Sequence, residues 1–243
     1  MEEISLKAEE LFRIGGFSLT NSLFLTFIVS FILILLSFLI YRKINIIPGK
    51  LQSVAEISIE WFLSLMESTL GSLKKAEMYF PLVATIFIFI MFSNILGIFP
   101  GVGSLYIKEG VKNVPIFRSP AADLNFTLAF AVISVIITNL LGIMAVGFFP
   151  YISKFLNFGD PIKFFVGLLE IVSEFAKIIS LSFRLFGNVF AGEVLLTIIF
   201  FLAPYFIPLP FLFLELFVGL IQAFLFAMLT LVAITLSTTV EEH

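Results

Sequence analysis

Cysteine is absent from the 243 residues of this chain, and its single histidine is His243. Without cysteine, the chain can form no disulfide, no thiolate metal site and no thiol nucleophile. One terminal histidine leaves almost no room for histidine-based metal binding or general-base chemistry inside an apolar segment. A hydrolase of the Ser–His type would therefore lack its base, and we expect neither a metal nor another cofactor.

Charge is scarce as well, since charged residues make up 13% of the chain and the formal net charge is −3. A weakly acidic chain does not fit nucleic acid, which proteins bind with basic surfaces. Hydrophobic residues supply 60% of the chain, which includes 33 phenylalanines, and the mean hydropathy is +1.15. Soluble domains of this size lack that balance, so we predict an all-α, polytopic helical membrane protein surrounded by a lipid bilayer.

Five apolar runs are long enough to cross a bilayer, which takes about twenty residues. They are residues 20–41, 78–99, 123–149, 164–203 and 211–239. The fourth would be roughly 60 Å long as one helix, twice the hydrocarbon thickness, so it either breaks near Gly187 or runs strongly tilted. The Pro-rich turn at residues 204–210 folds the last two runs into a hairpin. We expect a single integral membrane domain over residues 1–243, because no linker or internal repeat divides the chain.

The polar segments differ from these runs. In residues 48–75, apolar positions recur every three or four residues with glutamates between them, which predicts an amphipathic surface helix. Residues 1–19 are expected to form a short polar segment with a small helix, and residues 100–122 and 150–163 are expected to be loops.

Basic residues suggest an orientation. Arg42, Lys43 and Lys50 directly follow the first apolar run. Because loops rich in lysine and arginine stay in the cytoplasm, we expect this end inside, the N-terminus outside and the C-terminus cytoplasmic. The bias is modest, because the 100–122 loop on the other side carries Lys108, Lys112 and Arg118.

The fourth apolar run carries a polar stripe on one helical face. Its members recur at helical spacing and are Glu170, Ser173, Lys177, Ser180, Arg184 and Asn188. Arginine keeps its charge, and a charge at the bilayer centre costs roughly 2.5–3.5 kcal/mol. Arg184 should therefore face protein, a cavity or a partner, and it has no acid one turn away on its own helix.

A structural alternative exists for part of this stripe. Ser173, Ser180 and Gly187 are predicted to sit at close helix–helix contacts, with Glu170 or Glu174 pairing Lys177. Arg184 does not fit that alternative well, and an ionisable residue within a membrane segment is by default a functional-site hypothesis.

The hairpin brings further polar residues together. If the hairpin bends near Pro204, two residues whose numbers sum to about 408 lie at similar depth, because both of its helices rise equally per residue. Glu215 then falls opposite Glu193, and Gln222 falls within a turn of Arg184. Two adjacent carboxyl groups can share a proton, which suits a proton relay. The alternative is that Glu193 and Glu215 merely accept hydrogen bonds from loop backbone.

Polar residues also begin and interrupt the third apolar run. Asp123 and Asn125 stand at its start, where they either cap the helix or line an access path. Asn139 lies deep in the run and is expected to join neighbouring helices.

Residues 181–193, with the sequence LSFRLFGNVFAGE, resemble the signature of subunit a of the F-type ATP synthase. The family pattern is close to L-R-L-F-G-N-x-x-A-G-E/H, and it aligns on Arg184. Four further segments resemble the family in the same order: IPGKLQ (47–52), SPAADLN (119–125), LIQAFLFAMLT (220–230) and EEH (241–243). The resemblance therefore covers nearly the whole chain.

This resemblance implies a non-catalytic subunit that conducts protons, or Na⁺, in a bacterial inner membrane. Its implied partners are the ring of c subunits, the b subunits of the peripheral stalk and the rest of the complex. Residues 48–75 would be a candidate contact for that stalk. The last two helices would lie tilted against the ring.

The resemblance also implies roles for individual residues. Arg184 would face the ring carboxylates and separate two half-channels, with Asn188 and Gln222 beside it. Glu193 and Glu215 would serve the external half-channel, with Asp123 and Asn125 as further candidates. Glu170, Ser173 and Lys177 would lie towards the cytoplasm. One departure is that many members pair a histidine with a glutamate where this chain has Glu193 and Glu215.

Two other classes of membrane protein share part of this pattern. A self-contained ion-coupled secondary transporter also uses charged helices, but it requires repeat symmetry that this sequence lacks. A purely structural membrane scaffold would leave the polar stripe unexplained. Co-purification with small hairpin subunits separates these classes.

Overall fold

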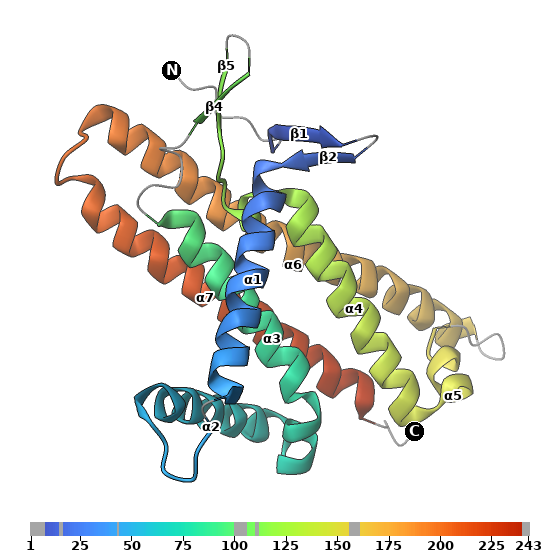
Figure 1. Ribbon diagram of the computed structural model, residues 1–243. Coiled ribbons are helices and arrows are strands. Elements are labelled where there is room, and N and C mark those ends of the chain that lie inside the picture. Colours follow the sequence, from blue (N-terminus) through green and yellow to red (C-terminus); the bar gives the residue numbers. More distant parts are fainter. Residues whose placement is uncertain are drawn as a thin grey trace.

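The computed structural model describes residues 8–14, 17–42, 44–99, 106–109, 112–155 and 161–239. Within that part of the chain, five helices are long and apolar enough to cross a membrane, as the sequence predicts. They are α1 (Asn21–Arg42), α3 (Leu73–Ile98), α4 (Leu124–Val146), α6 (Pro161–Leu202) and α7 (Pro208–Thr238). Figure 1 shows these helices as one elongated bundle.

Helices α6 and α7 form the predicted hairpin and lie side by side across the bundle (Figure 1). Helix α6 is a single helix of 42 residues, about 63 Å at 1.5 Å per residue. It does not break at Gly187, so the tilted alternative is the one that fits its length. Each helix begins at a proline, Pro161 in α6 and Pro208 in α7, which costs no intrahelical hydrogen bond at that position.

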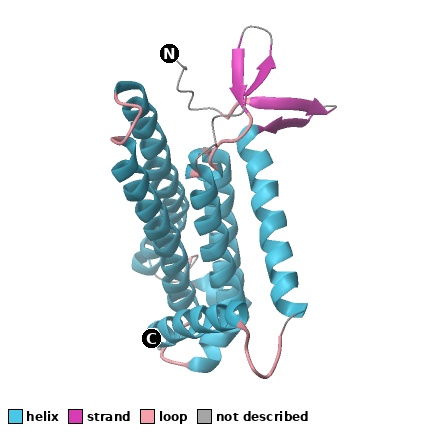
Figure 2. Cartoon of the chain, turned by 60° about the vertical axis from the view of Figure 1, so that its left-hand side comes forward, coloured by secondary structure: helices cyan, strands magenta, loops and turns pink. Residues whose placement is uncertain are grey.

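The amphipathic segment forms α2 (Lys50–Leu70), which crosses one end of the bundle (Figure 2). Its apolar side packs on α3 and α7, with Phe62 stacked on Phe87 at 5.2 Å and Met66 fully buried. Gly71 ends the helix with a left-handed φ of 68°, and its N–H donates to the Glu67 carbonyl. Trp61 is 54% exposed, which suits a helix lying at an interface.

The opposite end carries two β-hairpins (Figure 2), and there two expectations were wrong. The described part of residues 1–19 forms β1 (Glu10–Ile14) paired with β2 (Phe17–Thr20), not a small helix. Alternation explains the strand, since Leu11 is buried while Phe12 is exposed. The dipeptide Gly15-Gly16 between them is a hairpin signal in the sequence.

The second hairpin lies in the 100–122 segment that was expected to be a loop. It pairs β4 (Tyr106–Glu109) with β5 (Lys112–Pro115), and the 3₁₀ turn η1 (Pro120–Ala122) follows. Both hairpins lie at the end of the bundle away from the last turn of α7 (Figure 2). This arrangement agrees with an odd number of passes, while the sidedness in the membrane stays a prediction.

Part of the expected 150–163 loop is also ordered. The short helix α5 (Phe148–Ser153) follows Gly147, whose φ of 98° turns the chain sharply after α4. Asp160, which precedes Pro161 in the sequence and is of a residue type favoured at a helix N-cap, lies outside the described residues.

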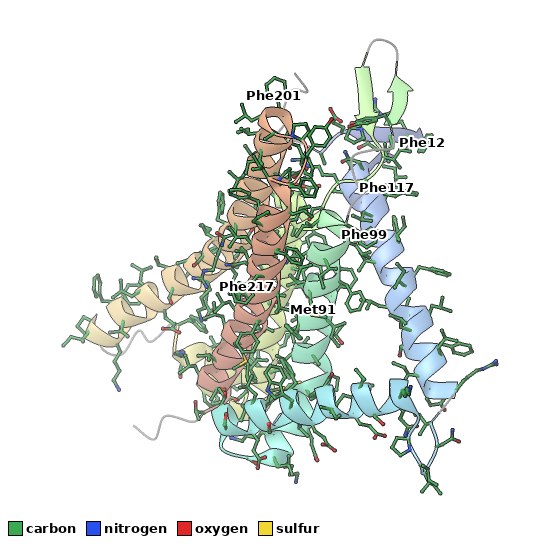
Figure 3. All side chains as sticks on the ribbon, turned by 90° about the vertical axis from the view of Figure 1, so that its left-hand side faces the viewer. Phe12, Met91, Phe99, Phe117, Phe201 and Phe217 are labelled. Atoms are coloured by element: carbon green, nitrogen blue, oxygen red, sulfur yellow. The ribbon has the colours of Figure 1, made fainter. Side chains whose placement is uncertain are left out.

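The core is built from small and branched side chains between α3, α4, α6 and α7. Its fully buried members include Ile90, Ala131, Ala223 and Leu231. Large apolar side chains instead project outward along the bundle, among them Phe201 and Phe217, which are 72% and 58% exposed (Figure 3). This outward apolar surface is what a lipid bilayer requires.

Candidate functional site

Arg184 lies near the middle of α6 with its side chain exposed. Its Nη2 donates a hydrogen bond to Ser180 Oγ at 3.1 Å, one turn back along the helix. Arg184 and Gln222 share a shallow hollow between α6 and α7, whose other lining residues are Leu181, Leu185 and Phe226. No ion pair formed within the described ranges includes Arg184.

The helical face around Arg184 is open. Asn188 is exposed, and its Nδ2 donates to the Arg184 carbonyl at 2.9 Å. A Cβ at Gly187 would meet nothing within 4 Å, and Ser173 and Ser180 are exposed. The expectation that Ser173, Ser180 and Gly187 make close helix–helix contacts is therefore wrong within this chain. The small residues leave a face that another helix could approach.

The predicted register of the hairpin is confirmed. The Glu215 carboxylate packs directly on Gly192, leaving no room for a Cβ there. Their numbers sum to 407, against the expected value of about 408, and 184 plus 222 gives 406. Glu215 is 8% exposed, and the neighbouring Glu193 side chain is 39% exposed. The two carboxyl groups thus come from different helices to one place.

A basic residue joins this pair. Arg118, between β5 and η1, places its Nε 3.6 Å from Glu193 Oε2, and only 7% of its side chain is exposed. Its guanidinium also lies over the Phe190 ring, 5.9 Å from the centroid. Glu193 therefore interacts with a charged side chain, so the alternative of a purely backbone role does not describe it.

Asp123 and Asn125 act as a cap. Asp123 Oδ1 accepts from Asn125 N at 2.9 Å and Asn125 Nδ2 at 3.1 Å, which starts α4. Asp123 Oδ2 accepts from Ser22 Oγ of α1 at 2.5 Å. Both carboxylate oxygens are engaged, so this residue ties α1 to α4 at the hairpin end of the bundle.

Toward the other end of α6, ion pairs gather. Lys154 Nζ lies 2.7 Å from Glu170 Oε1, and Lys177 Nζ lies 2.6 Å from Glu174 Oε1. Lys177 is thus paired with Glu174, one of the two partners considered. Ser173 is exposed on the face between these pairs and takes no part in either.

Asn139 extends this cluster to α4 and α5. Its Nδ2 donates to Glu174 Oε2 at 3.2 Å, and its Oδ1 accepts from Tyr151 Oη at 2.7 Å. The expectation that Asn139 joins helices is confirmed. Burial, followed by the negative charges of Glu174 and Glu170, raises the pKa of Tyr151 to about 12, so the hydroxyl keeps the proton that it donates.

Comparison with known proteins gives the family. The model of the family described as ATP synthase A chain matches residues 23–235. The chain belongs to the ATP synthase A chain family. It is 38% identical to ATP synthase subunit a of Campylobacter jejuni (strain 81-176) over 218 residues, covering 88% of each chain. It is 36% identical to that of Moorella thermoacetica, covering 91% of this chain and 92% of the relative.

The family match includes the site residues from Arg118 onward and leaves out β1, β2 and Ser22. Among those residues, the sequence analysis missed Arg118 as a site member and treated it only as a charge in a loop. The available signal was its place directly before SPAADLN, a segment that resembles the family. Spacing along one helix cannot reveal it, because it reaches Glu193 from a segment 75 residues earlier in the chain.

Proposed function

We propose that this chain is the ion-conducting subunit a of a bacterial F-type ATP synthase, coupling ion flow to rotation of a ring of c subunits. The observation that carries this proposal is Arg184. It is a charged group in the middle of a membrane-length helix, on an open face, with no acidic partner within ion-pair distance in the described chain.

A guanidinium at membrane depth needs a counter-charge, because it cannot lose its proton. The face around it is formed by Ser180, Gly187 and Asn188, so a helix from another subunit can approach closely. A carboxylate on that helix would complete the ion pair. Such a site alternates between neutral and ionised as protons, or Na⁺, arrive and leave.

The remaining polar residues divide into two access paths in this proposal. Glu193 and Glu215 form the relay of the external half-channel, with Asp123 and Asn125 as the cap that holds its outer wall. Asn188 and Gln222 line the region beside Arg184. Glu170, Ser173 and Lys177 belong to the cytoplasmic side. The fixed positive charge of Arg184 stands between the two paths and prevents a direct leak.

In this role the chain does not make or hydrolyse ATP itself. It forms one integral membrane domain, with its N-terminus outside and its C-terminus in the cytoplasm of a bacterial cell. Its partners are the c ring, the b subunits of the peripheral stalk and the remainder of the synthase.

The test is reconstitution of the complete synthase in liposomes with Arg184→Ala. ATP-driven pumping and ATP synthesis should fall to background while assembly persists, and passive proton leak should persist or rise. Arg184→Lys should also fail to couple, because an ammonium does not reproduce the planar guanidinium. Arg13→Ala, which removes an exposed arginine of β1, is the matched control and should pump normally. Coupled pumping by Arg184→Ala would refute the assignment.

A further inference from the structure

Arg118 is held in an unusual place for an arginine. It follows the second hairpin, yet its side chain is only 7% exposed and points to Glu193 of α6. Long cationic side chains are rarely this buried unless they are paired. The side chain of its partner Glu193 is 39% exposed, although the Oε2 atom that faces Arg118 is itself buried.

The backbone that carries Arg118 is fixed on both sides. Before it, Phe117 stacks on Phe24 of α1 at 5.8 Å, and Asn21 Nδ2 donates to the Pro115 carbonyl at 3.3 Å. Figure 3 shows Phe117 beside the upper end of α1. After it, η1 packs against α6 with Ala121 and Ala122 fully buried.

Because the backbone is fixed on both sides, the Arg118 guanidinium is already held in one position, and ordering it costs little entropy when a charge develops beside it. The segment that carries Arg118 therefore holds a single positive charge in a fixed position.

One cation in this place meets two acids. Glu193 from α6 is 3.6 Å from Arg118, while Glu215 from α7 lies on Gly192 beside it. Of the other described polar side chains near this end of the bundle, Asp123 accepts hydrogen bonds from Ser22 and Asn125, and Asn94 of α3 donates to the Gly219 carbonyl.

A site with one fixed cation and two adjacent carboxyl groups is electrically balanced when one carboxyl is ionised and the other holds a proton. Because the ion pair of Arg118 joins it to Glu193 of α6, the two protonation arrangements are not equivalent. The ionised form is favoured at Glu193.

We propose that Arg118 is a positioning residue that keeps Glu193 ionised and thereby makes Glu215 the member of the pair that takes up and releases the proton. This inference rests on the proposed function. In each cycle a proton from the external water forms an O–H bond on Glu215, and that bond breaks when the next acceptor toward the ring takes the proton. Glu193 keeps its charge throughout and supplies the field that draws the proton in.

The experiment uses the reconstituted synthase and follows ATP-driven proton pumping from about pH 5 to about pH 9. Arg118→Gln should reduce pumping about tenfold and displace the pH profile, because Glu193 then competes for the proton. Arg118→Lys, which keeps the charge, should retain most of the rate and the wild-type profile. Arg13→Gln, the same exchange at an exposed arginine, should change nothing.

A double-mutant cycle separates positioning from packing. If Arg118 acts through Glu193, Arg118→Gln should have little further effect in a Glu193→Gln background. An undiminished effect in that background would overturn the proposal, as would an unchanged pH profile in Arg118→Gln alone. If Arg118→Gln fails to assemble, Arg118→Lys decides: assembly with the wild-type profile supports the proposal, and failure of both variants replaces it with a packing role.

Failure of this inference can be told from failure of the proposed function. Arg184→Ala is measured in the same preparation. If it pumps normally, the proposed function is wrong. If it abolishes pumping while Arg118→Gln behaves as wild type, only the role of Arg118 is wrong.

Discussion

The two ends of α6 use charge in opposite ways. The Glu170 end, made of Lys154, Glu170, Glu174 and Lys177, matches each acid with its own lysine at 2.7 and 2.6 Å. The Glu193 end, made of Arg118, Glu193 and Glu215, sets one cation against two acids.

The difference separates structural ion pairs from a protonation site. At the Glu170 end, which we call the balanced end, each ion pair lowers the energy of both charges and so favours the charged state of both groups. At the Glu193 end, the unbalanced end, one cation cannot neutralise two carboxylates in a poorly hydrated place. This cluster must therefore hold a proton or release one, so it responds to proton supply. Arg184 lies between the two ends, and no acid of the described residues forms an ion pair with it.

The largest effect on proton pumping should come from neutralising the two carboxyl groups of the unbalanced end. Glu193→Gln and Glu215→Gln should each lower pumping about tenfold, and the double variant should lower it by more than either single variant but by less than the roughly 10²-fold product of the two. If the carboxyls act as one relay, the combined effect will depart from the product of the single effects. Pumping is measured in liposomes with Glu60→Gln, an exposed glutamate of α2, as control. Normal pumping by the double variant would end the relay hypothesis.

The close contact between the Glu215 carboxylate and Gly192 can be tested by adding a single methyl group. Gly192→Ala places a methyl group where the Glu215 carboxylate lies, so α6 and α7 must separate or Glu215 must turn away. We expect a loss of about 1–3 kcal/mol in stability, together with reduced pumping.

Gly49→Ala is the matched control for that variant, because a Cβ at Gly49 meets nothing within 4 Å. Denaturant unfolding of the detergent-solubilised complex gives the comparison. Equal stability of the two alanine variants would contradict the close packing of Glu215 on Gly192.

The balanced end should respond in stability more than in transport. Glu174→Gln leaves Lys177 without its partner and weakens the bond from Asn139, at a cost of about 1–2 kcal/mol. Removing both charges, with Glu174→Gln and Lys177→Gln together, should recover part of that loss. Unfolding is compared with that of Glu67→Gln, an exposed position on α2. A Glu174→Gln variant that unfolds like wild type but no longer pumps would reverse the assignment of the two ends.

The sequence predicts the balanced end better than the unbalanced one. Lys177 and Glu174 lie one turn apart on one helix, and the hairpin register follows from equal rise in two helices. Arg118 is different, because its meeting with Glu193 depends on how η1 seats against α6. The two strand pairs were not predicted either, because strands of four or five residues give weak periodicity; Gly15-Gly16 is the hairpin signal that the sequence contains for the first pair.

The smallest effect we predict is at Tyr151, which closes the balanced end from α5. Tyr151→Phe removes the hydroxyl that donates to Asn139 Oδ1 at 2.7 Å, which should cost about 0.5–1 kcal/mol. The pH dependence of the free energy of unfolding tests the role of Tyr151 more specifically. Burial, then Glu174 and Glu170, raises the pKa of Tyr151 from 10.0 to about 12, so the fold favours the neutral phenol.

A group whose pKa is raised by folding stabilises the protein fully below its unfolded value, and that contribution disappears as the pH passes through the folded value. Wild type should therefore lose stability between pH 10.0 and about pH 12, and Tyr151→Phe should lack this part of the loss. Unfolding of both proteins across that window provides the measurement, with Tyr205→Phe at an exposed tyrosine as control. Identical alkaline profiles for wild type and Tyr151→Phe would mean that neither burial nor the charges of Glu174 and Glu170 raise the pKa of Tyr151 on folding, and the balanced end would then stop at Asn139.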